Sequence, residues 1–355
     1  MTLSLSARLA VAERALGRSV VAVNPRAVAV AEGKAPGHAC VGVKDTADIP
    51  AELLEKLFSL PGYLPLTVDR MSDMGRSVDT ELVNPLTYRP MTGSTSGGAV
   101  NVLKGINDLC VGTDGGGSVL APALASNLYA FMGKGIGLAC ASASKSTDDL
   151  DFVAGIGYIG RSLELVVQAA RDVSGARLEE AGRPAKVLVP APGCASLPGG
   201  GDMFERVASF AEKAGLAVEP LEFQDVYDRS KTVRELRRLW SGDPAACVLT
   251  FEGPIDVFSA DETIPRSFAR PAVDRVAGVR SKAICKSVNI AGGTGVCIPS
   301  PYLACGLLVC CGSGAGAAAG AVRVAELLDR SIELPASLTR YFLDRGKELH
   351  PLELF

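Results

Sequence analysis

Histidine is almost absent from this chain of 355 residues, which contains only His38 and His350. His38 lies in a stretch rich in glycine and proline, and His350 is close to the C-terminus. This scarcity argues against a Ser-His-Asp triad and against a histidine-rich metal site, because both need imidazoles at defined places. If the protein has a catalytic base, we expect a residue other than histidine.

The sequence also lacks a Cys-x-x-Cys motif, although it contains ten cysteines. A zinc ribbon or a thioredoxin-like site is therefore not supported, and we expect reduced, mostly buried thiols in a cytoplasmic protein. The net charge of -3 provides no electrostatic attraction to nucleic acid or to an anionic membrane. The composition favours a small polar or neutral partner.

Charged residues are missing from the stretch 302–322, which is long enough to span a bilayer. Several glycines between residues 312 and 316 interrupt it, so the better interpretation is a buried strand at 307–311, a glycine turn and a helix at 317–328. The N-terminal segment carries charges within its apolar part, which predicts an amphipathic helix rather than a signal peptide.

Apolar runs and amphipathic segments alternate along the whole chain. The expected strands are 20–23, 40–43, 64–68, 109–111, 135–141, 152–158, 186–189, 245–251, 296–299 and 307–311, and the expected longer helices are 4–16, 51–59, 99–104, 163–173, 202–214, 226–239, 271–287 and 317–328. This alternation predicts an α/β fold with helices on both faces of one sheet. We expect a single domain over residues 1–355.

Two clusters of glycine and serine, 93–98 and 112–118, mark the candidate site. Ser118 follows three glycines, whose amides could converge on an oxyanion beside its hydroxyl, and a helix starting just afterwards would add its positive dipole end. The alternative is a tight turn in which Ser118 only caps that helix. The local sequence leaves both interpretations open.

A serine nucleophile needs a base, and a buried lysine with a lowered pKa can provide one. Lys44 ends an apolar run and precedes Asp45, so it fits this role, although a solvated charge at a strand end is the alternative. A nucleotide site is poorly supported, because GTDGGGS lacks P-loop spacing and no GxGxxG follows the first strand. We expect no cofactor and no metal.

Three segments resemble motifs of the amidase signature family, whose members use a Ser–cis-Ser–Lys triad. Residues 84–99 (NPLTYRPMTGSTSGGA) resemble the family's first glycine-serine run, 110–123 (CVGTDGGGSVLAPA) its second, and 40–48 (CVGVKDTAD) the strand that supplies its lysine. The resemblance implies a single domain with a central mixed sheet. Its signature core would cover about 40–175, and a part closing the sheet about 245–330.

Carried over position by position, the resemblance makes Ser118 the nucleophile, Ser94 the relay serine after a cis peptide bond, and Lys44 the base. Ser94 and Ser118 are 24 residues apart, which is the usual spacing in the family. An alignment on the following Gly-Gly pair would put Thr95 at the relay position, and the sequence does not exclude it. The implied oxyanion hole comprises the amides of Gly115, Gly116, Gly117 and Ser118, with Thr95, Ser96 and Asp114 in supporting roles.

The resemblance implies an amidohydrolase that cleaves a linear C–N amide bond of a small substrate through an acyl-enzyme and releases ammonia or an amine. Family members commonly carry an arginine shortly after the nucleophile, where this chain has Leu120 and Ala121, so a neutral or apolar acyl group is favoured. Two alternatives remain: a glutaminase-type amidotransferase subunit with a synthetase-like partner, and a catalytically silent scaffold. A homodimer is also compatible, and neither nucleic acid nor a membrane is an expected partner.

Overall fold

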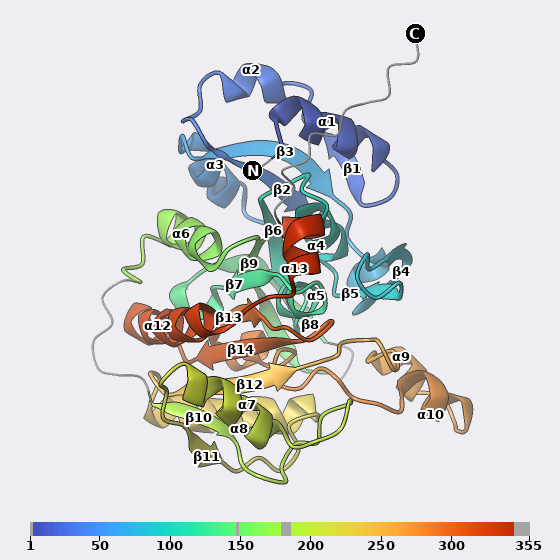
Figure 1. Cartoon of the computed structure of the whole chain (residues 1–355), viewed down its shortest axis with the longest axis vertical. Helices are drawn as coiled ribbons and strands as arrows, with labels where there is room; N and C mark the ends of the chain where they lie inside the picture. The colour runs from blue at the N-terminus through green and yellow to red at the C-terminus, as the bar shows by residue number, and fades with distance from the viewer. Residues whose placement is uncertain (1–2, 147–148, 179–185, 344–355) are drawn as a thin grey trace.

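A mixed sheet of twelve strands runs through the computed structural model, which describes residues 3–146, 149–178 and 186–343 (Figure 1). Its strands in spatial order are β1 (Val20–Val23), β3 (Tyr63–Asp69), β2 (Ala39–Lys44), β6 (Leu109–Asp114), β9 (Asp151–Gly160), β7 (Tyr129–Met132), β13 (Thr294–Pro299), β14 (Gly306–Cys311), β12 (Cys247–Glu252), β10 (Val187–Pro190) and β11 (Glu219–Leu221), and β8 (Ala139–Lys145) pairs with β9. A separate two-stranded sheet contains β4 (Val78–Val83) and β5 (Pro90–Thr92).

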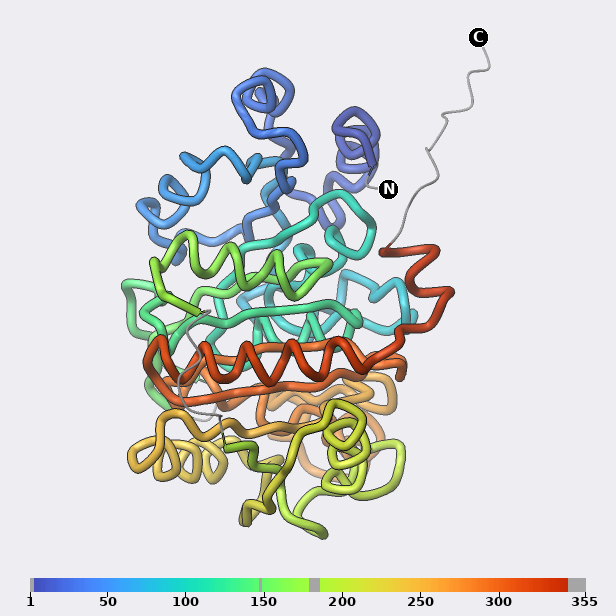
Figure 2. Tube along the Cα trace, turned by 60° about the vertical axis from the view of Figure 1, so that its left-hand side comes forward, coloured from blue at the N-terminus to red at the C-terminus, as the bar shows by residue number. Residues whose placement is uncertain are grey.

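Helices cover both faces of the large sheet. On one face α3 (Ala51–Ser59), α6 (Leu163–Ser174), α12 (Ala315–Ser331) and α7 (Met203–Lys213) contact one another in this order, and Figure 2 shows α6 and α12 side by side across it. On the other face lie α4 (Ser96–Leu103) and α5 (Leu120–Ala125). The remaining α-helices are α1 (Leu5–Arg14), α2 (Ala27–Ala31), α8 (Arg229–Gly242), α9 (Thr263–Arg266), α10 (Ala272–Ala277), α11 (Val288–Ala291) and α13 (Ala336–Leu338). This arrangement confirms the predicted fold class.

The central strands are apolar because helices cover them on both sides. Every residue of β6, β12, β13 and β14 is buried, as expected for strands without a solvent-facing side. The charge-free stretch 302–322 forms β14, a turn and the start of α12, so the prediction of strand, turn and helix is confirmed. Among the described helices, none combines the length and apolar character needed to cross a bilayer.

The helix expected at 271–287 is wrong over most of its length. Only α10 is helical there, and the backbone amides of Ala283, Ile284 and Cys285 donate to the buried carboxylate of Glu252 at 2.6 to 2.9 Å. An α-helix would need these amides for its own carbonyls four residues earlier. The carboxylate on β12 therefore holds this segment, the 283–286 loop, in a non-helical conformation.

Candidate active site

Lys44 is the last residue of β2, and its side chain is buried beside the end of β6. Only 4% of the residue is exposed, and Nζ lies 2.6 Å from Ser94 Oγ and 2.7 Å from Thr113 Oγ1. β2 and β6 are parallel neighbours, so their carboxyl ends meet at one edge of the sheet. The structure thus rules out the alternative of a solvated charge at a strand end.

The environment of Lys44 favours its neutral amine. Burial lowers the pKa of Lys44 to about 8 from an ordinary value of 10.5, and the negative charge of Asp114 partly opposes this shift. Removal of water disfavours the ammonium form, which is the physical reason for the direction. An amine with this pKa can accept a proton in mildly alkaline solution.

Backbone contacts bring the two glycine-serine clusters together. Gly93 has a φ of +69°, and a Cβ there would lie 2.5 Å from Pro122 Cδ, so only glycine fits before Ser94. The amide of Thr95 donates to the carbonyl of Ser118 at 3.2 Å. The relative positions of the two serine segments are therefore set by the main chain.

The cis peptide bond expected before Ser94 is not present. Within the described residues, cis bonds occur at Gly253–Pro254 and Arg270–Pro271, and the bond between Gly93 and Ser94 is trans. The left-handed conformation of Gly93 already turns the chain at this point, and the Ser94 hydroxyl reaches Lys44 from a trans bond. This part of the family pattern is wrong for the present structure.

Asp114, rather than Ser118, caps the helix that follows the second cluster. Its buried carboxylate accepts hydrogen bonds from the amides of Gly117 at 2.6 Å, Val119 at 2.7 Å and Leu120 at 3.1 Å. Ser118 is half-buried, and its hydroxyl makes no hydrogen bond within the described part of the chain. The alternative in which Ser118 only caps the following helix is therefore wrong.

The loop of residues 115–118 leaves fewer free amides than the sequence suggested. The Gly117 amide points to Asp114, so the candidate oxyanion donors in this conformation are the amides of Gly115, Gly116 and Ser118. Close packing explains the glycines: a Cβ on Gly115 would lie 2.6 Å from the Phe152 ring, and one on Gly116 would lie 2.8 Å from an Arg229 nitrogen.

The geometry favours Ser94 over Thr95 as the relay. The Thr95 side chain packs against β6, where a Cβ on Gly112 would lie 2.6 Å from its Oγ1, and this hydroxyl is buried without a hydrogen-bond partner among the described residues. Ser96 donates to Asp79 Oδ2 at 2.7 Å, away from Lys44. Thr95 and Ser96 thus lie beside the site and do not contact the lysine amine.

A cavity of about 390 Å³ connects the candidate residues. Lys44, Ser94 and Ser118 all line it, together with apolar side chains that include Phe152 and Ile264. The hydrogen bond from Lys44 to Ser94 is formed, whereas a bond between the Ser94 and Ser118 hydroxyls is not among the contacts of the described residues. Catalytic hydrogen bonds are often long in the absence of substrate and shorten when it binds.

Two groups in or near the cavity were missed from the sequence. Thr113 accepts a hydrogen bond from Lys44 at 2.7 Å. It lies near the carboxyl end of β6, directly before Asp114, and this position could have indicated from the sequence that its side chain reaches the site. Arg229 comes from α8, more than a hundred residues from Ser118, and no local pattern places it there. No group of three or more His, Cys, Asp or Glu that could hold a metal occurs in the described ranges.

Comparisons with known proteins identify the fold. No protein-family model and no curated protein matches the sequence. Solved structures do match: 6-aminohexanoate cyclic dimer hydrolase complexed with substrate (14% identity, 95% of this chain and 96% of that chain, TM-score 0.65), native peptide amidase from Stenotrophomonas maltophilia (15%, 93% and 93%, 0.62) and a variant of Kluyveromyces lactis allophanate hydrolase (13%, 97% and 70%, 0.66). At this identity the likeness shows that the chain has the fold of these hydrolases.

Proposed function

We propose that this protein is an amidohydrolase that cleaves a linear C–N amide bond of a small substrate. The observation that carries the proposal is the buried amine of Lys44, 2.6 Å from the Ser94 hydroxyl in the cavity that Ser118 also lines. Because the chain contains only two histidines, the proposed reaction needs another base. Lys44 has the lowered pKa that lets a lysine accept a proton from a serine hydroxyl. The fold shared with solved amidases supports the same conclusion.

In the proposed mechanism, Ser118 attacks the amide carbonyl while its proton passes through Ser94 to neutral Lys44. Thr113 Oγ1 accepts a hydrogen bond from the lysine amine, which leaves the lone pair free to face Ser94. The amides of Gly115, Gly116 and Ser118 are placed to stabilise the oxyanion, and one such donor contributes about 3 kcal/mol in other hydrolases.

Breakdown of the tetrahedral intermediate requires a proton on the leaving nitrogen. Protonated Lys44 returns it through Ser94, the C–N bond breaks, and ammonia or an amine leaves. Water then attacks the ester of Ser118 and gives a proton through Ser94 to Lys44. The lysine returns this proton through Ser94 to Ser118 Oγ as the ester bond breaks, which releases the carboxylic acid and restores the free serine and the neutral amine. Both halves of the reaction thus use the same short chain of groups.

Replacement of the nucleophile tests the proposal. We expect Ser118→Ala to lower ammonia or amine release from a panel of linear amides by about a thousandfold or more. Ser209→Ala, on the exposed side of α7, is the matched control and should retain full activity. Mass spectrometry after treatment with a fluorophosphonate should locate one adduct on Ser118.

Two outcomes would count against the enzyme assignment. Turnover by Ser118→Ala at the rate of the unmodified protein would exclude this serine as the nucleophile. A folded protein with no turnover and no fluorophosphonate adduct would instead favour a catalytically silent subunit. Inclusion of glutamine in the amide panel tests whether the protein acts as a glutaminase.

A further inference from the structure

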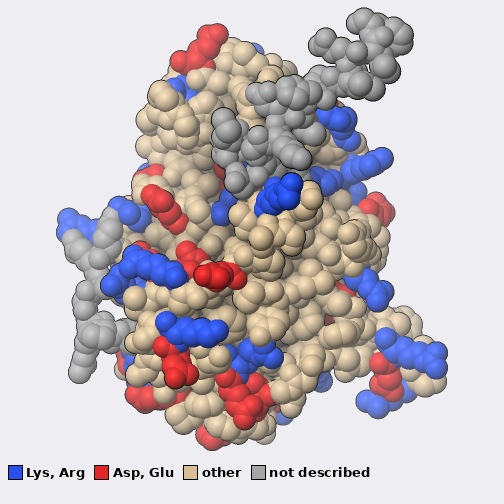
Figure 3. Space-filling view, in the orientation of Figure 1, with Lys and Arg blue, Asp and Glu red and all other residues tan. Residues whose placement is uncertain are grey.

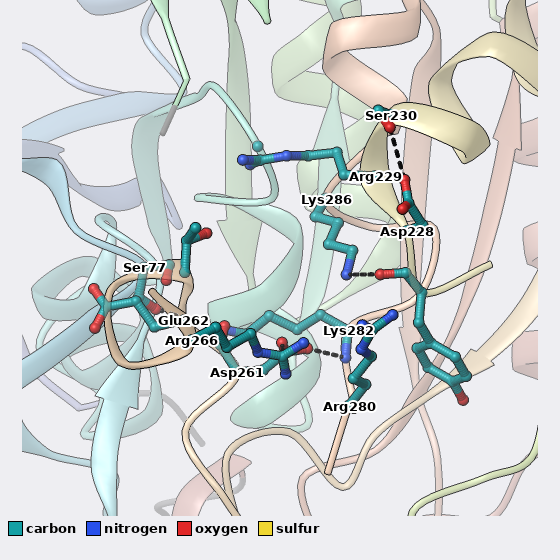
Figure 4. Close-up of a pocket in the computed structure, with 13 residues that line it drawn as sticks. Ser77, Asp228, Arg229, Ser230, Asp261, Glu262, Arg266, Arg280, Lys282 and Lys286 are labelled. Carbon is teal, nitrogen blue, oxygen red and sulfur yellow. Dashed lines mark hydrogen bonds and ion pairs between the residues drawn. The ribbon is translucent and has the colours of Figure 1, made fainter. Parts of the chain in front are cut away.

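A second cavity of about 300 Å³ adjoins the one that contains Ser118 (Figure 4). The two cavities share the lining residues Ser77, Gly116, Arg229, Glu262 and Thr263. Gly116 belongs to the loop that presents Ser118, so a molecule bound at the nucleophile can extend directly into this second space. Its walls come mainly from the segments 227–230, 261–266 and 280–286.

Basic side chains outnumber acidic ones around the second cavity. The basic residues that line it are Arg229, Arg266, Arg280, Lys282 and Lys286, and the acidic ones are Asp228, Asp261 and Glu262. On the face of the molecule seen in Figure 3, by contrast, basic and acidic side chains are interspersed. Three of the five basic residues form ion pairs, Arg266 with Asp261, Arg280 with Asp225 and Lys282 with Asp256. Lys286 forms no ion pair among the described residues, so it is the candidate contact for an anion.

The acidic residues of the cavity already have partners. Glu262 binds Arg76 at 2.8 Å, Asp261 binds Arg266 at 2.7 Å, and Asp228 accepts from the amide of Lys231 at the start of α8. Among the basic residues, Lys286 has a neutral hydrogen-bond acceptor instead of a carboxylate. Its ammonium donates to the carbonyl of Tyr227 at 2.7 Å. Lys286 thus has further donors for an anion in the cavity.

Two pKa shifts show the electrostatic character of the cavity. Burial alone would raise the pKa of the Asp261 carboxyl, yet the positive charges of Lys286, Lys282 and Arg266 hold it below its ordinary value. Burial lowers the pKa of Lys286, and the charge of Asp261 only partly opposes this. A bound anion would offset the lost hydration of Lys286 and raise its pKa again.

The position of Lys286 relative to the nucleophile is fixed by the backbone. Glu252 holds the amides of residues 283–285, and a Cβ on Gly117 would lie 3.3 Å from the Cα of Lys286. The 283–286 loop therefore packs against the loop of Ser118. The ordered backbone places Lys286 beside the Ser118 loop, and the hydrogen bond to Tyr227 directs its ammonium, so less entropy is lost when a substrate is oriented there.

We propose that the substrate is an amide that also carries a carboxylate, and that the second cavity binds this carboxylate with Lys286 as its main cationic contact. This proposal rests on the proposed amidohydrolase function and specifies its substrate class. It replaces the expectation of a neutral or apolar acyl group, which considered only the residues directly after Ser118. The positive charge comes instead from segments distant in the sequence.

A matched pair of amides tests this substrate class: succinamate, and its neutral isostere 4-oxopentanamide. We expect kcat/KM for ammonia release to favour succinamate by about tenfold or more, because hydrogen bonds to a charged group are the strong ones. Lys286→Met should reduce this preference about tenfold, mainly through KM, and Lys286→Arg should retain most of it. Lys186→Met, an exposed lysine before β10, is the matched control and should leave the preference unchanged.

Binding to Ser118→Ala protein separates this proposal from the proposed function. Calorimetric titration should show tighter binding of succinamate than of 4-oxopentanamide, and the additional change Lys286→Met should remove the difference. This result without any ammonia release by the unmodified protein would sustain the carboxylate site and overturn the amidohydrolase. Equal hydrolysis of both amides, or a preference that survives Lys286→Met in a protein of unchanged Tm, would overturn the carboxylate site alone.

Discussion

The burial of one lysine determines what the candidate site can do. Lys44 is enclosed at the junction of two parallel strands, and its amine contacts two hydroxyls, those of Ser94 and Thr113. A solvent-exposed lysine would remain protonated near neutral pH and could not accept a proton. The surrounding residues thus favour the neutral amine that the proposed general base requires.

The pH dependence of the reaction is expected to follow Lys44. Because burial lowers its pKa to about 8, the neutral form increases with pH, and kcat/KM should rise through about pH 8 and then level off. A pH–rate profile measured with a neutral amide gives this apparent pKa directly. Lys44→Met should be inactive across the range, and a flat profile for the unmodified enzyme between about pH 6 and about pH 9 would contradict the role of the lysine.

For single residues, the sequence predicted most members of the candidate site. The motifs selected Lys44, Ser94 and Ser118, and the structure places all three around one cavity. The choice between Ser94 and Thr95 depended on a one-residue alignment shift, and the contact of Lys44 with Ser94 and the packing of Thr95 against Gly112 favour Ser94. The use of the Gly117 amide by Asp114 was equally invisible, because it depends on the path of the loop.

Among the secondary-structure elements, β12 also determines the conformation of a loop outside the sheet, residues 283–286. Glu252 at its end accepts three backbone amides and the hydroxyl of Thr250. These contacts hold the 283–286 loop in a non-helical conformation. The hydrophobic pattern of the sequence does not predict this irregular structure. Helix periodicity in 271–287 was misleading because the competing partner is a side chain from another element.

Replacement of Glu252 by glutamine should loosen this loop. One amide oxygen cannot accept all the hydrogen bonds of a carboxylate, and an unsatisfied buried donor costs about 1–3 kcal/mol. We therefore expect Glu252→Gln to lower the free energy of unfolding in urea by about 2 kcal/mol. Glu205→Gln, on the exposed side of α7, should change it by less than about 0.5 kcal/mol. Equal stability of the two variants would show that the carboxylate does not order the loop.

On the scale of the whole molecule, a buried ion pair fastens the N-terminal helix to the sheet. Arg8 of α1 donates to Asp108 at 2.7 Å, just before β6, and also to the carbonyls of Gly105 and Ile106. The Arg8 side chain is only 4% exposed. This contact joins segments a hundred residues apart, and a single sequence offers no means to predict the pair.

Removal of this arginine is expected to destabilise the entire fold. Arg8→Met leaves Asp108 buried without its cation, and loss of one partner of a buried pair costs about 3–5 kcal/mol. The exposed Arg14 on the same helix provides the control, since Arg14→Met should cost less than about 0.5 kcal/mol. Urea denaturation of the two variants measures both values. Similar midpoints for both would indicate that α1 contributes little to stability.

The sequence predicted the α/β class and the position of most long elements, because strong hydrophobic periodicity determines them. It did not give the order of the strands, in which β9 lies between β6 and β7. Short strands such as β11 were also missed, because their pairing depends on neighbours distant in the chain. Topology and pairing are properties of the assembled molecule.

The proposed reacting groups and most of the walls of the second cavity come from two separate stretches of chain. Lys44, Ser94 and Ser118 belong to the first third of the sequence, whereas the basic walls of the second cavity come from residues 227–286. Random mutagenesis confined to the later stretch can therefore alter which molecules are accepted while the reacting groups stay untouched. The architecture offers a natural starting point for laboratory evolution of new selectivities.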